Sequence, residues 1–303
     1  MRSFLHGARN SLERKGDAGV YGVLILQSFM ASGTHLVAKV VVQAVDAFTL
    51  TLVRSFVAAA GIGLVMLMRG RFPAVRREDY RLILALSILA IPINQFFFLF
   101  GMRFTTPSNA ALLYATTPIL VLLFSRWFLG EQLTRKKIYG VVLAFIGVTL
   151  VIFERGLDAG MQYLMGNMII FLAVLAWGLY TVYGRRLTSK YGPLDASAIT
   201  LLTGTVLFLP IGIIPAISFP FASLTFANWF QILYLGIVTS ILAYMLWYYA
   251  LSRIEAAKVA LFANLQPILT TLMAVLLLGQ DLTLLFLLGG IIAIGGVVLA
   301  QFG

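Results

Sequence analysis

Apolar and polar positions divide the chain into long hydrophobic stretches joined by short polar connections. About twenty apolar residues, rising 1.5 Å each, cross the hydrocarbon core of a bilayer as a helix that satisfies its own backbone hydrogen bonds. The pattern predicts ten transmembrane helices, at residues 20–42, 47–68, 80–101, 107–127, 136–153, 165–185, 195–217, 227–250, 257–277 and 283–302.

Composition supports a membrane protein. Of the 303 residues, 61% are hydrophobic and only 11% are charged, whereas a soluble domain is nearer half apolar and a quarter charged. The predicted fold class is therefore an all-α integral membrane protein. The chain has no cysteine, which excludes disulfides, thiolate metal sites and cysteine nucleophiles.

Basic residues are concentrated in alternate connections. The net charge is +11, and 18 of the 22 lysines and arginines fall in the N-terminal segment or in loops that share its side when ten helices are counted. This positive-inside bias accounts for the charge better than nucleic-acid binding does. We therefore predict that residues 1–19 form a cytoplasmic tail, that both termini are cytoplasmic, and that the chain resides in a bacterial inner (plasma) membrane.

A repeat relates the two halves of the chain. Displaced by 149 residues, the segment 111–150 matches 260–299 at 15 of 40 positions, including Pro118 with Pro267 and three glycines in register. Apolar composition alone would align leucines, but not a proline and glycines. We predict two homologous units of five helices each, at residues 20–155 and 165–302.

The two units are expected to lie in opposite orientations, because each has an odd number of spans. The charges agree, since the connection at 135–137 reads RKK whereas its counterpart at 284–286 reads LLF. Inverted repeats are typical of transporters, in which one half moves against the other around a site near the bilayer midplane. The sequence thus predicts ten transmembrane helices as two inverted five-helix repeats around a central cavity.

The five-plus-five layout, the pattern P-I-L…L-G-E-x-L-T…G…G-V and the stretch FTLTLVRSFVAA resemble the drug/metabolite transporter superfamily, specifically its EamA-type ten-helix members. The resemblance covers residues 20–302 and implies a helix bundle with a cavity between the halves. Members move amino acids, metabolites or drugs, often outward. The small multidrug members carry protons on a membrane-embedded glutamate, and this chain departs from them because no predicted span has an acid at its centre.

Four polar residues of the first span share one helix face at helical spacing: Ser28, Ser32, His35 and Lys39. Polar groups on one stripe avoid lipid and face the bundle or a water-filled cavity. Ser32 and His35 are therefore candidate substrate-binding residues, and a structural hydrogen bond between helices is the alternative for His35. In the second unit, the approximate counterparts of these two residues are Trp177 and Tyr180, which we add as candidates.

The third and eighth spans supply a second group of candidates. Asn94 and Gln95 are amides that hydrocarbon would penalise unless they face protein or a cavity. The eighth span carries three aromatic residues on one face, at i, i+3 and i+4: Tyr244, Trp247 and Tyr248. An aromatic cavity wall would suit flat, apolar or cationic solutes, and packing within the bundle is the alternative.

The repeated prolines predict a kink in each unit. Pro118 and Pro267 each lack a backbone N–H and leave one helix carbonyl free, which lipid tolerates only beside protein or a cavity. The polar residues near them are candidate site residues: Tyr114, Thr117, Asn264 and Gln266. We interpret the two kinks as symmetry-related walls of one transport site, with a purely structural hinge as the alternative.

Arg54 lies within the second span. Bonds to backbone carbonyls or loop groups are the favoured explanation for it, and attraction of an anionic carboxylate is the alternative.

The chain is accordingly predicted to be a secondary transporter that exports amino acids or related metabolites by alternating access. A proton-coupled exporter of drugs or lipophilic cations is the second interpretation, and a membrane receptor or scaffold is a third. No enzyme activity, catalytic residue, metal site or cofactor is expected, because acids and histidines form no cluster and no nucleotide-binding loop is present. The expected partners are a small-molecule substrate and the lipid bilayer, without nucleic acid, and a monomer is compatible with the sequence.

Overall fold

The structure is a computed structural model that describes residues 2–154, 163–269, 272 and 284–302. The first half of the chain contains helices α1 (Arg2–Ala44), α2 (Ala47–Met68), α3 (Tyr80–Ile88), α4 (Phe96–Met102), α5 (Pro107–Ala115), α6 (Thr117–Phe124) and α7 (Arg135–Glu154). The second half contains α8 (Leu164–Tyr191), α9 (Pro193–Ser218), α10 (Phe226–Leu233), α11 (Tyr244–Leu251), α12 (Ala256–Ala260) and α14 (Leu284–Gln301).

Short non-α segments join several of these helices into longer spans. Wide π-helical segments are η2 (Leu89–Gln95), η3 (Ser125–Leu129) and η6 (Tyr234–Ala243), and the 3₁₀ segments are η1 (Arg77–Asp79), η5 (Phe221–Ser223) and η7 (Leu261–Asn264). Seven of the resulting helical stretches are long and apolar enough to cross a membrane, and two shorter apolar helices fall in the predicted ninth and tenth spans. With α7, the described residues occupy all ten predicted spans, which we number in chain order.

Several helices begin where the sequence provides a cap. The Asp46 carboxylate accepts hydrogen bonds from the amides of Phe48 and Thr49 at 3.0 Å, and so starts α2. Pro107 stands in the first turn of α5, where its missing N–H costs nothing. A reciprocal capping box between Thr225 and Asn228 starts α10. Local sequence therefore fixes the points at which the chain re-enters the bundle.

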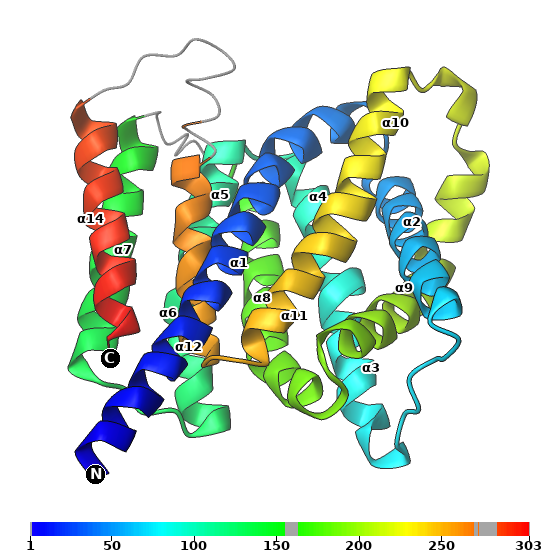
Figure 1. Ribbon diagram of the computed structural model, residues 1–303. Coiled ribbons are helices and arrows are strands. Elements are labelled where there is room, and N and C mark those ends of the chain that lie inside the picture. The colour runs from blue at the N-terminus through cyan, green and yellow to red at the C-terminus, as the bar shows by residue number, and fades with distance from the viewer. Residues whose placement is uncertain (1, 155–162, 270–271, 273–283, 303) are drawn as a thin grey trace.

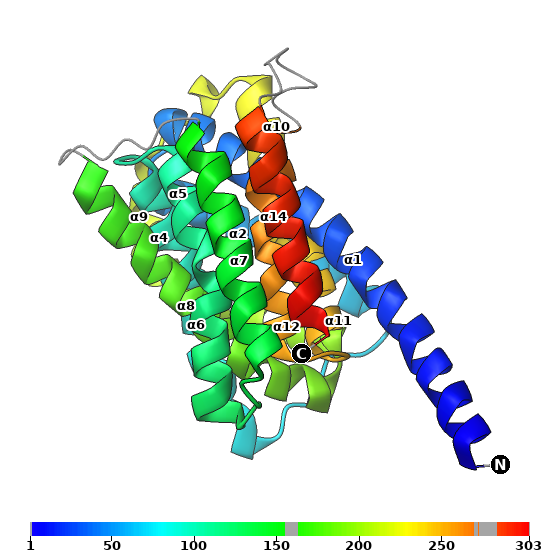
Figure 2. The ribbon, with the colours of Figure 1, turned by 90° about the vertical axis from the view of Figure 1, so that its left-hand side faces the viewer.

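The spans run side by side as one bundle, and the loops rich in arginine and lysine meet at one end of it (Figure 1). We call this the basic end and define it by the connections 69–79, 126–134, 186–192 and 252–255. The C-terminus and the start of α1 point toward the same end (Figures 1 and 2). Helix α1 begins at Arg2, so the N-terminal segment continues the first span as a helix.

Contacts between the halves repeat in a symmetric way. The first span packs against the eighth, η6 with α11, and the sixth span, α8, packs against the third, η2 with α4. The second and seventh spans, α2 and α9, pack together, as do the fifth and tenth, α7 and α14. This reciprocity is what two inverted five-helix repeats require, and it confirms the fold class that the sequence predicts.

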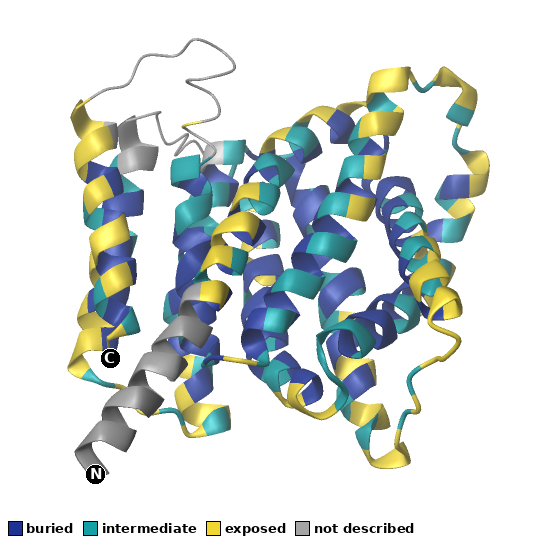
Figure 3. Cartoon of the chain, viewed as in Figure 1, coloured by how far each residue is buried: buried dark blue, intermediate teal, exposed yellow. Residues whose placement is uncertain are grey.

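Exposed residues lie along the outside of the bundle (Figure 3). Many of them are apolar, among them Leu64, Val206 and Ile291, which are 58%, 68% and 69% exposed. Such exposure would be costly in water and is expected in lipid. The α7–α14 pair lies at one side of the bundle, and its two backbones meet at Gly147 and Gly296. A Cβ on Gly147 would lie 2.3 Å from the amide nitrogen of Ala293, so close packing here depends on the missing side chain.

Ion pairs at the basic end connect the two halves. Glu131, from the connection after the fourth span, pairs with Arg185 of α8 and also accepts the backbone N–H of Ala256 at 3.3 Å. Lys137 of α7 pairs with Glu255 at 2.6 Å. Both pairs join the first half to the second.

Candidate functional site

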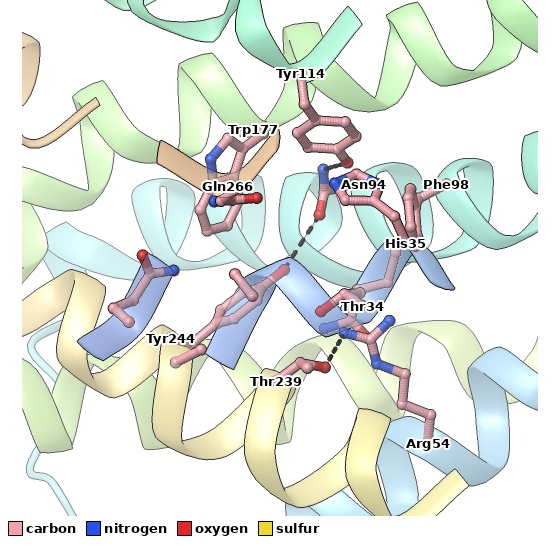
Figure 4. Close-up of a pocket in the computed structure, with 14 residues that line it drawn as sticks. Thr34, His35, Arg54, Asn94, Phe98, Tyr114, Trp177, Thr239, Tyr244 and Gln266 are labelled. Atoms are coloured by element: carbon pink, nitrogen blue, oxygen red, sulfur yellow. Dashed lines mark hydrogen bonds between the residues drawn. The ribbon is translucent and has the colours of Figure 1, made fainter. Parts of the chain in front are cut away.

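A cavity lies between the two halves, inside the ring of spans (Figure 4). Its empty space is about 580 Å³, a volume that includes space open to the outside. The lining side chains come from the first four spans of the first half and from the sixth, eighth and ninth spans of the second. Neither half could form the cavity alone.

Asn94 connects four spans through one side chain. Its amide nitrogen donates to the Tyr114 hydroxyl at 3.0 Å and to the carbonyl of Ala173 at 2.8 Å, and its oxygen accepts the Tyr244 hydroxyl at 3.2 Å. The two tyrosine bonds are internal to the cavity wall (Figure 4). A buried amide with its bonds filled stabilises one arrangement of the surrounding helices, so Asn94 gives the wall a fixed shape.

Gln95 and His35 have fewer hydrogen-bond partners than Asn94. Within the described residues, neither amide atom of Gln95 completes a hydrogen bond, although the side chain lies beside the Tyr244 hydroxyl. His35 packs edge-to-face against Phe98 and Tyr114, with ring centroids 5.4 and 5.5 Å apart. Its Nδ1 atom has no partner in the described part of the chain, and Gln266 lies within reach of the ring. These groups leave polar capacity for a bound solute.

Aromatic rings continue behind this wall. Trp177 lines the cavity and contacts Tyr244 and Tyr180 at centroid distances of 5.1 and 5.5 Å. Tyr180 stacks on Tyr248 at 5.1 Å, away from the lining, and the Trp247 indole donates to the Thr181 hydroxyl at 3.2 Å. Tyr180, Trp247 and Tyr248 are fully buried and support the rings that face the cavity.

π-Helical turns stand directly beside the lining residues of the third and eighth spans. A π-helical turn inserts an extra residue and is frequent at functional sites. Asn94 and Gln95 end η2, and both line the cavity, as do Ala243 and Tyr244 at the end of η6. These two pairs are equivalent positions of the repeat, 149 residues apart.

Arg54 also belongs to the lining, although it is only 3% exposed. Its Nε atom donates to the Leu235 carbonyl at 3.1 Å and to the Ser240 hydroxyl at 2.8 Å, and Nη2 donates to the Thr239 hydroxyl at 3.0 Å. The structural role favoured by the sequence is therefore present, because these bonds hold the π-helical segment η6. The guanidinium nevertheless points to the cavity (Figure 4).

The two prolines follow irregular turns in equivalent positions. Thr116 separates α5 from α6, with Pro118 in the first turn of α6. The 3₁₀ segment η7 precedes Pro267, and the Ser28 hydroxyl donates to the carbonyl of Phe262 in that segment at 3.0 Å. A first-span side chain thus bonds to the backbone of the irregular turn, at a carbonyl that also accepts the N–H of Leu265.

The predicted site residues divide into two groups. Seven line the cavity: His35, Asn94, Gln95, Tyr114, Trp177, Tyr244 and Gln266. Six are buried behind it or beside the kinks: Ser32, Thr117, Tyr180, Trp247, Tyr248 and Asn264. Ser32 donates to the carbonyl of Ser28 at 2.6 Å, and the Thr117 hydroxyl and the Asn264 amide have no hydrogen-bond partner among the described residues.

Sequence reasoning missed three polar lining residues, Gln27, Thr34 and Thr239. Gln27 lies eight residues before His35, and Thr34 lies directly before it. The face of the first span that lines the cavity is therefore rotated about the helix axis from the predicted face that carries Ser28 and Ser32. Helical spacing backward from His35 could have indicated Gln27. Thr239 was not predictable, because it reaches the cavity within a π-helical segment.

A membrane-embedded cavity built jointly by two inverted helical repeats defines a membrane transporter. Comparison with known proteins agrees, since the EamA-like transporter family matches residues 19–153 and again 164–302. The chain therefore belongs to the EamA-like transporter family, within the drug/metabolite transporter superfamily.

Relatives are similar over most of their length. The uncharacterized transporter YetK of Bacillus subtilis is 27% identical over 288 residues, which cover 93% of this chain and 87% of YetK. A protein of Streptantibioticus cattleyicolor named as a probable terminal-alkyne amino-acid exporter is 27% identical over 224 residues, 74% of each chain. A solved crystal structure has the same fold, with a TM-score of 0.77 at 20% identity over 94% of this chain and 96% of that one.

Proposed function

We propose that this transporter exports amino acids or related small metabolites by alternating access. The observation that carries the proposal is the composition of the cavity wall, in which amides from both halves stand beside aromatic rings. Amide groups such as those of Gln95 and Gln266 exchange hydrogen bonds with ammonium and carboxylate groups, and the rings of Trp177 and Tyr244 accept apolar side chains.

The charge of the wall also favours amino acids over cations. Among the described residues that line the cavity there is one arginine and no aspartate or glutamate. A lipophilic cation would meet a positive charge there without a compensating carboxylate. The relative named as a probable amino-acid exporter supports the same class of substrate.

A proton-coupled exporter of drugs or lipophilic cations is the second candidate. The rings of Tyr114, Trp177 and Tyr244 favour it, because aromatic faces attract organic cations. His35 would be its proton carrier, because it is the one histidine among the described residues of the lining and an imidazole can bind and release a proton.

The topology that we propose follows the basic end. Residues 1–19 form a cytoplasmic segment, the units 20–155 and 165–302 are the two moving halves, and both termini face the cytoplasm of a bacterial cell. The positive-inside rule supports this orientation, because the basic end gathers most arginines and lysines.

Uptake into liposomes that hold the purified protein separates the candidates. We expect labelled amino acids to enter faster than into protein-free liposomes, and lipophilic cations to show no such increase. If a pH gradient drives the entry of lipophilic cations and amino acids do not enter, the proton-coupled exporter is favoured. Absence of flux for every solute would favour a receptor or scaffold.

A further inference from the structure

Arg54 has bonding capacity that its protein partners leave unused. Its Nε and Nη2 atoms bond to η6, whereas no described residue accepts a hydrogen bond from Nη1. No carboxylate in the described part of the chain forms an ion pair with Arg54. An arginine keeps its charge in a protein, so an uncompensated cation stands in the cavity wall.

An uncompensated buried cation is costly, and a bound anion offsets that cost. The planar guanidinium suits a carboxylate, because a charged donor and a charged acceptor form short, strong hydrogen bonds. The surroundings of Arg54 are hydroxyl-rich, since Thr239 and Ser240 contact it and the Tyr114 and Tyr244 hydroxyls lie within electrostatic range. Hydroxyls orient the guanidinium without neutralising it.

We propose that Arg54 anchors the carboxylate of the transported solute through Nη1. The inference rests on the proposed function and narrows it to solutes with a free carboxylate. The rest of an amino acid would then extend along the wall toward Gln95, Tyr244 and Trp177, which offer an amide, a hydroxyl and ring faces. Because Nε and Nη2 of Arg54 donate hydrogen bonds to η6, the same residue would join the solute to the eighth span.

The test compares an amino acid with its carboxamide, which has nearly the same shape and lacks the negative charge. Binding of leucine and of leucinamide to the purified protein is measured by thermal stabilisation, and leucine uptake is measured in liposomes. Arg54→Gln removes the charge, and Arg54→Lys keeps it without the planar fork. Arg103→Gln makes the same chemical change at an exposed position and is the matched control.

Two further variants separate anchoring from support of η6. Thr239→Val and Ser240→Ala remove neutral partners of Arg54 but leave Nη1 and the charge in place. If Arg54 only supported η6, these variants and Arg54→Gln would weaken acid and carboxamide binding alike.

We expect the wild-type protein and Arg103→Gln to bind leucine at least about tenfold more tightly than leucinamide, in keeping with a charge-assisted pair. Arg54→Gln should abolish this preference and reduce leucine uptake, with Arg54→Lys intermediate. Equal binding of acid and carboxamide by the wild type, or an unchanged preference in Arg54→Gln, would overturn the proposal while leaving amino-acid export intact. If the protein binds other carboxylates but not leucine, and Arg54→Gln weakens their binding, the role of Arg54 as a carboxylate anchor is supported and the assignment to amino acids is wrong. Failure of every carboxylate to bind would reject both.

Discussion

Single residues of the cavity wall differ in how completely their hydrogen bonds are used. Asn94 has all three bonds of its network inside the protein, whereas His35 and Gln95 retain unused atoms. The first kind of residue fixes the shape of the wall, and the second kind is available to a solute. Substitution of the first kind of residue should therefore lower stability, and substitution of the second kind should lower transport alone.

His35→Ala is expected to lower transport without unfolding the protein. The ring lines the cavity, packs edge-to-face against Phe98 and Tyr114, and lies within reach of Gln266, another lining residue. Its loss therefore acts mainly on the cavity wall. Uptake in liposomes should fall about tenfold, the value of one well-placed polar contact. An unchanged rate and an unchanged pH profile would remove His35 from the site, and His35→Gln tests whether a polar group suffices.

Asn94→Leu is expected to destabilise the fold as well as abolish transport. The substitution leaves the Ala173 carbonyl and two tyrosine hydroxyls without their partner. At about 0.6 kcal/mol for each interhelical bond in a membrane, the loss is about 2 kcal/mol. Thermal unfolding in detergent measures it. A variant as stable as the wild type would show that the network contributes no net stability.

At the scale of elements, the sequence determined the spans well and their irregular turns poorly. Hydrophobic length indicates a helix, but it carries no signal for the π-helical segments Leu89–Gln95 and Tyr234–Ala243. Asn94 and Gln95 were predictable because they are amides within a span, whereas Thr239 reaches the cavity within a π-helical segment that the sequence does not indicate. The predicted stripe of the first span was similarly displaced, since Ser28 and Ser32 bond to backbone carbonyls instead of lining the cavity.

The α7–α14 pair gives a test of element packing. Gly147→Ala places a methyl group 2.3 Å from the backbone nitrogen of Ala293, which cannot move without shifting α14. Overpacking of this kind costs about 1–3 kcal/mol. Gly295→Ala, on the same pair of helices, meets nothing within 4 Å and is the control. The temperature of thermal unfolding should fall for Gly147→Ala and stay unchanged for Gly295→Ala. Equal unfolding temperatures of the two variants would contradict the packing described.

At the scale of the whole molecule, ion pairs hold the halves together at the basic end. Glu131 joins Arg185, and Lys137 joins Glu255. The repeat counterparts of Glu131 and Lys137 are Gln280 and Phe286, so the sequence does not repeat these charges. Gln280 lies outside the described residues.

Glu131→Gln combined with Lys137→Met is expected to favour opening at the basic end. Partly exposed pairs contribute about 0.2–1 kcal/mol each, so loss of both pairs should raise the open population about two- to thirtyfold. Labelling of Thr34→Cys in the cavity, by an impermeant thiol reagent added from the basic end, reports the change. Arg253→Gln is the control, because Arg253 stacks on Tyr249 of its own span. Equal labelling rates in the double variant and the control would exclude a role for the pairs in closure.

Alternating access requires that one cavity, shared by the two inverted halves, opens in turn to each side and holds the solute. The natural chain has no cysteine, so Thr34→Cys is its single reactive thiol and lies in the cavity wall. The direct measurement is the rate of labelling by an impermeant thiol reagent, from each side of the membrane separately, with and without a transported amino acid. We expect labelling from both sides, at a rate that the amino acid lowers. Labelling from one side only, or a rate that the amino acid does not change, would contradict it.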